Sequence, residues 1–280
     1  MNYKTILVSL NEVERLDTLL EVTATLANEH DAHVLGLYVI PAPAVYPSAG
    51  TYAIPEIFDS FTKYFEEQLN RVKERFESVM DRNGVRYRWL MIRSPVPAIS
   101  DTVDEIGRIA DLVVLSETDR KAQKGVELDL VQNIVLSVGR PVLVLPQNCG
   151  KDLKISQIIC GYNGSKEAAR AVHDALPFLK RADDVRLVWV DPALVSETAG
   201  PLPGADMAES LDRHGVRATA ESMPTNGINP AEALLTRARD LGSGMIVMGA
   251  YGHSRLKEFI LGGATRYALS NMRVPLMLSH

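Results

Sequence analysis

The chain has 280 residues and a formal net charge of −5, and 46% of its residues are hydrophobic. This composition is typical of a globular protein with substantial cores, and the negative charge argues against a duplex nucleic acid partner, which usually requires a basic face. The two cysteines exclude a disulfide framework, and no apolar run approaches the roughly 18–20 residues that span a bilayer. With no signal peptide visible, we expect a cytoplasmic protein without membrane contact.

Short apolar runs alternate with helical patterns along the first half. The run KTILVSL precedes a helical pattern from Glu14 to Asn28, and the run HVLGLYVI precedes a long one from Glu56 to Arg82. The runs DLVVLS and PVLVLP follow later. Nearly continuous β-branched runs are typical of parallel strands whose two faces are covered by helices. We therefore expect a doubly wound α/β fold built from right-handed βαβ units.

The second half repeats this order. The segment KISQIICGYNGSKEAARAVHDALPFL corresponds to KTILVSLNEVERLDTLLEVTATLA, and GMIVMG corresponds to DLVVLS. Pro97 and Pro230 are 133 positions apart, and so are Ser116 and Gly249. Agreement of several elements at once predicts two repeated domains, residues 1–147 and 153–280. Each would hold a mainly parallel five-stranded sheet flanked by helices.

A glycine-rich segment follows the strand GMIVMG. Gly249 and Gly252 come at its end, and Gly262 and Gly263 open a helical pattern that contains Thr265. Ligands of open α/β sheets bind outside the carboxyl ends of strands, and glycine lets a backbone approach closely. Free N–H groups at a helix start attract anions. The pattern predicts a phosphate loop built from backbone, with turn geometry alone as the simpler alternative.

The spacing of these glycines resembles the signature G-x2-G-x9-G-S/T of the universal stress protein family. Gly249, Gly252 and Gly262 fit the signature, whereas Gly263 stands where it has serine or threonine, so Thr265 is left to supply a hydroxyl. The resemblance extends over both halves and implies a tandem member with adenine nucleotide alpha hydrolase-like domains. It implies ATP or AMP as the ligand, Mg²⁺ as its companion, and hydrolysis that is slow at most.

The resemblance also assigns nucleotide contacts to individual residues. Where the family has an acidic residue that meets the ribose or the base, this chain has Asn163, whose amide hydrogen-bonds without charge. A turn or helix-cap role explains Asn163 equally well, and Val190 is also explained as a core strand residue. The positions matched to nucleotide contacts are Gly161, Tyr162, Asn163, Val190, Met248, Gly249, Gly252, Gly262, Gly263, Ala264 and Thr265.

The corresponding loop of the first half lacks the glycines. Ser116 stands where the second half has Gly249, and Asp119 stands where it has Gly252. A carboxylate repels phosphate, and any Cβ obstructs the approach of backbone amides. We therefore expect one nucleotide site, in the second domain.

Three functions stay open from the sequence. The leading hypothesis is a stress-response protein that binds ATP or AMP and regulates, because no base that would activate water is visible and no catalytic or metal-ligating residue is assigned. The alternatives are a nucleotide-free tandem protein that acts through protein or other ligand contacts, and a slow ATP-hydrolysing enzyme. The resemblance further implies an intrachain pseudo-dimer, paired around a pseudo-two-fold axis through the strands RPVLVLP and RVPLMLS, with a homodimer also open.

Overall fold

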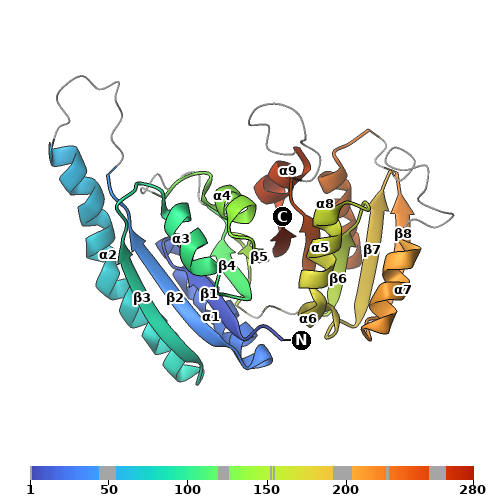
Figure 1. The fold of residues 1–280 in the computed structure, drawn as a ribbon, viewed down its shortest axis with the longest axis horizontal. Helices are drawn as coiled ribbons and strands as arrows, with labels where there is room; N and C mark the ends of the chain where they lie inside the picture. Colours follow the sequence, from blue (N-terminus) through green and yellow to red (C-terminus); the bar gives the residue numbers. More distant parts are fainter. Residues whose placement is uncertain are drawn as a thin grey trace. The chain divides into compact units, whose positions relative to one another are not determined.

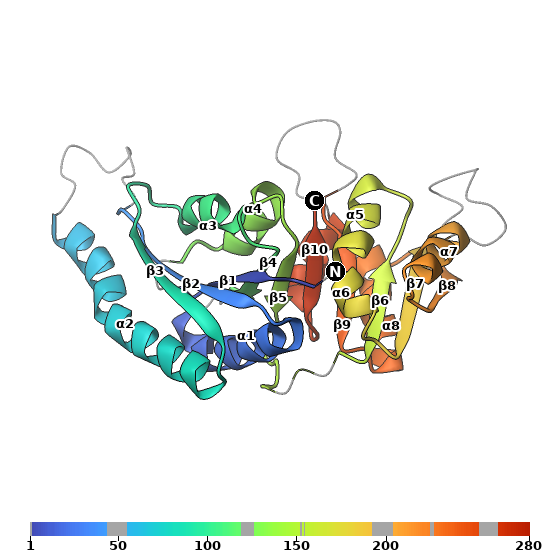
Figure 2. The same ribbon diagram turned by 60° about the horizontal axis from the view of Figure 1, so that its bottom comes forward.

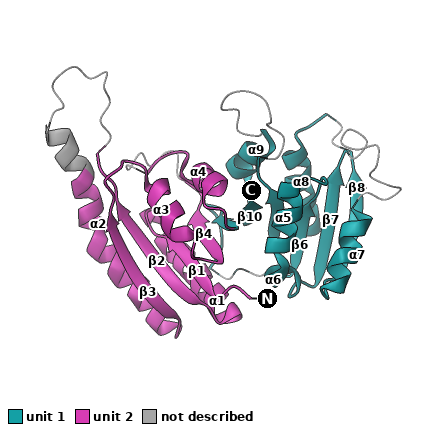
Figure 3. Ribbon diagram, in the orientation of Figure 1, with its two compact units in different colours: residues 1, 141–280 teal, residues 2–140 magenta. Residues whose placement is uncertain are grey.

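The structure is a computed structural model (Figure 1). It describes residues 2–43, 55–118, 126–151, 153, 155–191, 204–224, 227–251 and 263–280. The chain divides into two compact units (Figure 3). We name them in chain order: the first unit is residues 2–140, magenta in the figure, and the second unit is residues 141–280, teal in the figure. The repeat boundaries expected from the sequence, 1–147 and 153–280, stay a prediction.

The first unit is a parallel sheet covered by helices on both faces. Its elements are β1 (Thr5–Ser9), η1 (Val13–Arg15), α1 (Leu16–His30), β2 (His33–Ile40), α2 (Pro55–Arg82), β3 (Arg86–Arg93), α3 (Ile99–Gly107), β4 (Leu112–Ser116) and α4 (Leu130–Ser137). The strand order is β3-β2-β1-β4, and each neighbouring pair is parallel. Helices α1 and α2 pack together on one face, and α3 and α4 on the other (Figure 2).

The second unit repeats this layering. Its elements are β5 (Val142–Leu145), β6 (Gln157–Gly161), α5 (Lys166–Asp174), α6 (Leu176–Leu179), β7 (Asp184–Val190), α7 (Ala205–Arg213), β8 (Ala218–Met223), α8 (Pro230–Leu241), β9 (Met245–Gly249), α9 (Gly263–Asn271) and β10 (Leu276–Ser279). The strand order is β5-β10-β9-β6-β7-β8, parallel except for the antiparallel pair β5 and β10. The expected doubly wound, mainly parallel α/β fold is confirmed.

The last strands of the two sequence repeats pair directly. Val144 of β5 lies opposite Leu276 of β10, and Val142 lies opposite Leu278. Both strands are buried and apolar, which is why neither is left as a bare edge. The wider pseudo-two-fold relation between the halves stays a prediction.

The helix boundaries follow local chemistry. Helix α1 begins at Leu16, two residues later than the sequence pattern indicates, because Val13–Arg15 form a tight 3-10 turn. The helix ends at His30, and Asp31 caps it by adopting the left-handed conformation (φ 51°) and donating its N–H to carbonyls of the last turn. Aspartate tolerates this conformation better than most residues, because its short polar side chain bonds locally.

A close approach between α2 and β2 fixes the core of the first unit. Phe76 of α2 is fully buried, and a Cβ added at Gly36 of β2 would lie 2.5 Å from two carbons of its ring. The neighbouring Tyr38 is also fully buried, and its hydroxyl donates to the carbonyl of Phe65 at 2.9 Å. Gly36 thus provides the space in which the Phe76 ring packs against the sheet.

Gly36→Ala is expected to destabilise the protein by about 1–3 kcal/mol, because overpacking forces the ring of Phe76 out of place. The matched control is Gly150→Ala, where an added Cβ has no neighbour within 4 Å. Urea unfolding followed by circular dichroism measures both variants. Equal unfolding midpoints would show that Phe76 moves aside freely.

Candidate functional site

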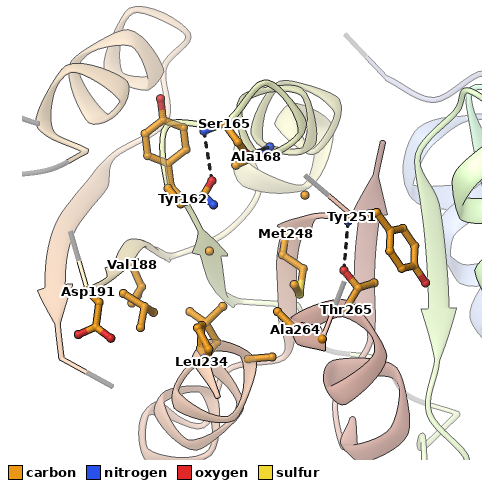
Figure 4. Close-up of a pocket in the computed structure, with 17 residues that line it drawn as sticks. Tyr162, Ser165, Ala168, Val188, Asp191, Leu234, Met248, Tyr251, Ala264 and Thr265 are labelled. Carbon is orange, nitrogen blue, oxygen red and sulfur yellow. Dashed lines mark hydrogen bonds between the residues drawn. The ribbon is translucent and has the colours of Figure 1, made fainter. Parts of the chain in front are cut away.

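A cavity of about 360 Å³ lies at the carboxyl ends of β6, β7 and β9 in the second unit, with α5, α8 and α9 completing its wall (Figure 4). This is the edge of an open parallel sheet at which ligands bind. Nine residues that the sequence assigned to a nucleotide line this cavity: Gly161, Tyr162, Asn163, Val190, Met248, Gly249, Gly263, Ala264 and Thr265. The other two, Gly252 and Gly262, lie outside the described residues.

Sequence reasoning missed a second set of lining residues, which are Ser165, Ala168, Val188, Asp191, Pro230, Ala231, Leu234 and Tyr251. A signal existed for the start of α8. Asn229 caps this helix by accepting the N–H of Ala231 at 2.9 Å, and Pro230 occupies its first turn. Because α8 follows β8, its start lies at the same sheet edge as the glycine segment. Leu234, one turn further, carries no comparable signal.

The turn between β6 and α5 is built by two polar side chains. Asn163 Oδ1 accepts the N–H of Ser165 at 3.1 Å, and Ser165 Oγ caps α5 by accepting the N–H of Ala168 at 3.2 Å. Gly164 between them has φ 72°, and an added Cβ would lie 3.1 Å from the Trp189 ring. The interpretation of Asn163 as a turn residue is therefore confirmed, and a contact with nucleotide stays a prediction.

The packing of the fold requires glycine at position 249, which the sequence alone did not reveal. A Cβ added there would lie 2.5 Å from the backbone nitrogen of Ala168 and 2.5 Å from the carbonyl carbon of Glu167. Strand β9 and the first turn of α5 therefore meet backbone to backbone at this glycine. The close approach holds the end of β9 and the start of α5 together at the edge of the cavity.

A hydrogen bond joins the end of the glycine strand to α9. Tyr251 has φ 61°, and its N–H donates to Thr265 Oγ1 at 3.2 Å. Thr265 is buried, and a hydroxyl that accepts one hydrogen bond still has its own proton to donate. Gly263 is exposed at the start of α9, and within the described ranges the atom nearest to an added Cβ is Asn229 Nδ2, at 4.0 Å.

The cavity is mostly apolar. Val188, Val190, Leu234 and Met248 contribute apolar side chains to its lining, and Asp191, drawn on the side of Val188 in Figure 4, is the one formally charged side chain among its described lining residues. Burial raises the pKa of the Tyr162 phenol, and the negative charge of Asp206 raises it further. Tyr162 therefore stays neutral at physiological pH.

At the corresponding sheet edge of the first unit, the asparagine after the first strand is buried and bonded to the neighbouring strand. Asn11, the counterpart of Asn163, is buried, and its amide donates to the Val39 carbonyl at 2.7 Å and accepts the Val39 N–H at 3.1 Å. Ser9 and Leu10 beside it are buried as well. The same amide thus ties two strands together in the first unit and a turn in the second. Asp119 lies outside the described residues.

Among the described residues, no group of three or more histidine, cysteine, aspartate or glutamate side chains is arranged to hold a metal ion. The helices of the described ranges include none with the length and apolar character needed to cross a bilayer.

Comparison with known proteins identifies the family of the domain that contains this cavity. Residues 154–280 match the model of the universal stress protein family. The second half of the chain is a universal stress protein domain. A universal stress protein of Synechocystis sp. is 23% identical over 184 residues, which are 63% of this chain and 60% of that relative. The aligned part thus spans less than two thirds of the relative's length.

Solved structures extend the likeness in fold to the whole chain. A universal stress protein from Archaeoglobus fulgidus aligns with a TM-score of 0.68 and 17% identity, covering 98% of this chain and 97% of that one. A protein of unknown function from Pseudomonas aeruginosa aligns with a TM-score of 0.62 and 12% identity, covering 99% and 92%. The universal stress protein fold therefore covers both halves.

Gly249→Ala is expected to lower the free energy of unfolding by about 3 kcal/mol without any nucleotide present, because the added methyl meets backbone that cannot rotate away. Gly263→Ala, at the other end of the glycine segment, should change stability by less than about 1 kcal/mol. Urea unfolding of the ligand-free protein compares them. Full stability of the Gly249 variant would contradict the packing role of this glycine.

Proposed function

We propose that this protein binds ATP or AMP in the cavity of the second unit and acts as a regulatory stress protein. The supporting observation is the gathering of nine sequence-assigned residues around one cavity at the carboxyl ends of β6, β7 and β9. Its volume, about 360 Å³, lies within the range of small-ligand sites. The resemblance to nucleotide-binding family members supplies the ligand class.

The two ends of the cavity suit the two ends of a nucleotide. Val188, Val190 and Leu234 offer apolar side chains against which a purine ring can pack. At the opposite end, Thr265 lies in the first turn of α9, where the N–H groups and the positive end of the helix dipole favour phosphate (Figure 4). The base therefore lies over β7 and the phosphates point toward α9.

Mg²⁺ would enter this site as the companion of the nucleotide. Among the described lining residues, the carboxylate of Asp191 lies at the apolar end, away from Thr265. A magnesium ion bound by phosphate oxygens and water requires no dedicated protein cage. Both thiols, Cys149 and Cys160, are free, which supports the cytoplasm as the proposed compartment.

A nucleotide-free protein is the second candidate. Two observations favour it: Asn163 is engaged in the turn before α5, and the packing of β9 against α5 explains Gly249 without any ligand. Under this alternative the cavity takes another small molecule or none, and the protein acts through contacts with partners.

Ala264→Glu is expected to separate the two candidates. The wild-type chain should bind one ATP, and the variant should bind it on the order of 100-fold more weakly, because a carboxylate and added bulk meet the phosphates in the cavity. Glutamate in the first turn of α9 suits the helix dipole, so folding should persist. Ser270→Glu, which adds the same charge at an exposed position near the end of α9, is the control.

Isothermal titration of nucleotide-stripped protein measures the stoichiometry and the affinity. Two ATP molecules per chain, or equal affinity in the Ala264→Glu variant, would place the site elsewhere. Absence of binding by the wild type would favour the nucleotide-free candidate.

Hydrolysis of bound ATP is expected to be slow, well below the roughly 10 per second of a median enzyme. A general base must lie within hydrogen-bond reach of the attacking water, and the described carboxylate of the cavity lies at the far end from α9. Release of phosphate by purified protein measures the rate. A rate near 10 per second that Ala264→Glu abolishes would establish an enzyme instead.

A further inference from the structure

Asp191 brings a charge to the apolar end of the cavity. It follows β7 directly, adopts φ 47°, and lines the cavity together with Val188 and Leu234. Its N–H donates to the carbonyl of Met223 on β8 at 3.0 Å, which continues the pairing of Val190 with Met223. The strand pair therefore fixes the backbone from which this carboxylate projects.

The position of Asp191 excludes it from the phosphate end. In Figure 4 its side chain lies on the side of Val188, and Thr265 and Tyr251 lie on the opposite side. A carboxylate next to a phosphate would be repelled, whereas a carboxylate beside apolar walls is stabilised by any ligand group that donates a hydrogen bond. An ionised carboxyl accepts about four hydrogen bonds, so a ligand donor adds to partners already present.

We propose that Asp191 is a specificity-determining residue that accepts a hydrogen bond from the exocyclic amino group of the bound purine. This inference rests on the proposed function, which places the base over β7. The residue after the end of β6 in the cavity, Asn163, has an uncharged amide, so the one charge among the described lining residues is that of Asp191, which follows the neighbouring strand β7. The site thereby distinguishes purines by the hydrogen-bonding group on the edge of the base.

The experiment compares ATP with purine riboside triphosphate, which has hydrogen in place of the 6-amino group. The full-length wild type should prefer ATP by on the order of tenfold, the effect of one hydrogen bond to a charged group. Asp191→Gly removes the carboxyl and tolerates positive φ, and it should bring the preference close to one by weakening ATP. Asp191→Asn keeps an acceptor oxygen without the charge, so its preference should be intermediate.

Asp31→Gly is the matched control. Asp31 is also an aspartate with positive φ (51°), but it caps α1 in the first unit, so its variant should keep the wild-type preference. Urea unfolding midpoints confirm that each variant folds.

A wild-type preference that persists in Asp191→Gly overturns the role of Asp191 and leaves ATP binding intact. A change in the discrimination between ATP and 2′-deoxy-ATP, with the amino-group preference unchanged, would assign the carboxylate to the ribose and also overturn the proposal. If the wild type binds neither nucleotide, the proposed function fails and this inference falls with it.

Discussion

The backbone contact between the end of β9 and the first turn of α5 is the constraint on which the site depends. Only glycine fits at position 249, since a methyl group there would lie 2.5 Å from the backbone of Glu167 and Ala168. This approach brings the start of α5 beside the strand end that leads to Tyr251, and the hydrogen bond from Tyr251 to Thr265 continues the connection to α9. One side of the cavity wall therefore depends on a backbone contact at Gly249 and on a backbone-to-hydroxyl hydrogen bond at Thr265.

The two units use the asparagine after their first parallel strand in different ways. In the first unit, the amide of Asn11 bridges to Val39, and small and apolar residues around it are buried. In the second unit, Asn163 turns toward Ser165 and leaves the edge open above Gly161. The difference lies in which backbone groups the amide meets, because both residues follow equivalent strands. The two asparagines thus have different structural roles although the strands before them pair alike.

Much of the fold was predictable, because buried parallel strands leave continuous apolar runs and because the order of elements occurs twice. The cavity residues near glycines were predictable from spacing and from the rule that ligands bind at strand ends. The role of Gly249 was not, since the distance between a strand and a helix far apart in sequence leaves no local pattern. Asp191 and Leu234 were missed for the same reason. Strand register places Asp191 at the cavity and the rotation of α8 places Leu234 there, and the local sequence predicts neither the register nor the rotation.

The antiparallel pairing of β5 with β10 has a consequence for how the chain can be divided. Strand β5 lies in the expected first domain, residues 1–147, but in the compact unit of residues 141–280, so cutting the chain at the expected boundary would separate two hydrogen-bonded strands. The released second half would carry the unpaired backbone groups of Leu276, Met277 and Leu278, which pair readily with another strand. Covalent tandem fusion therefore keeps the partner of β10 within the same molecule, where its local concentration does not depend on expression level.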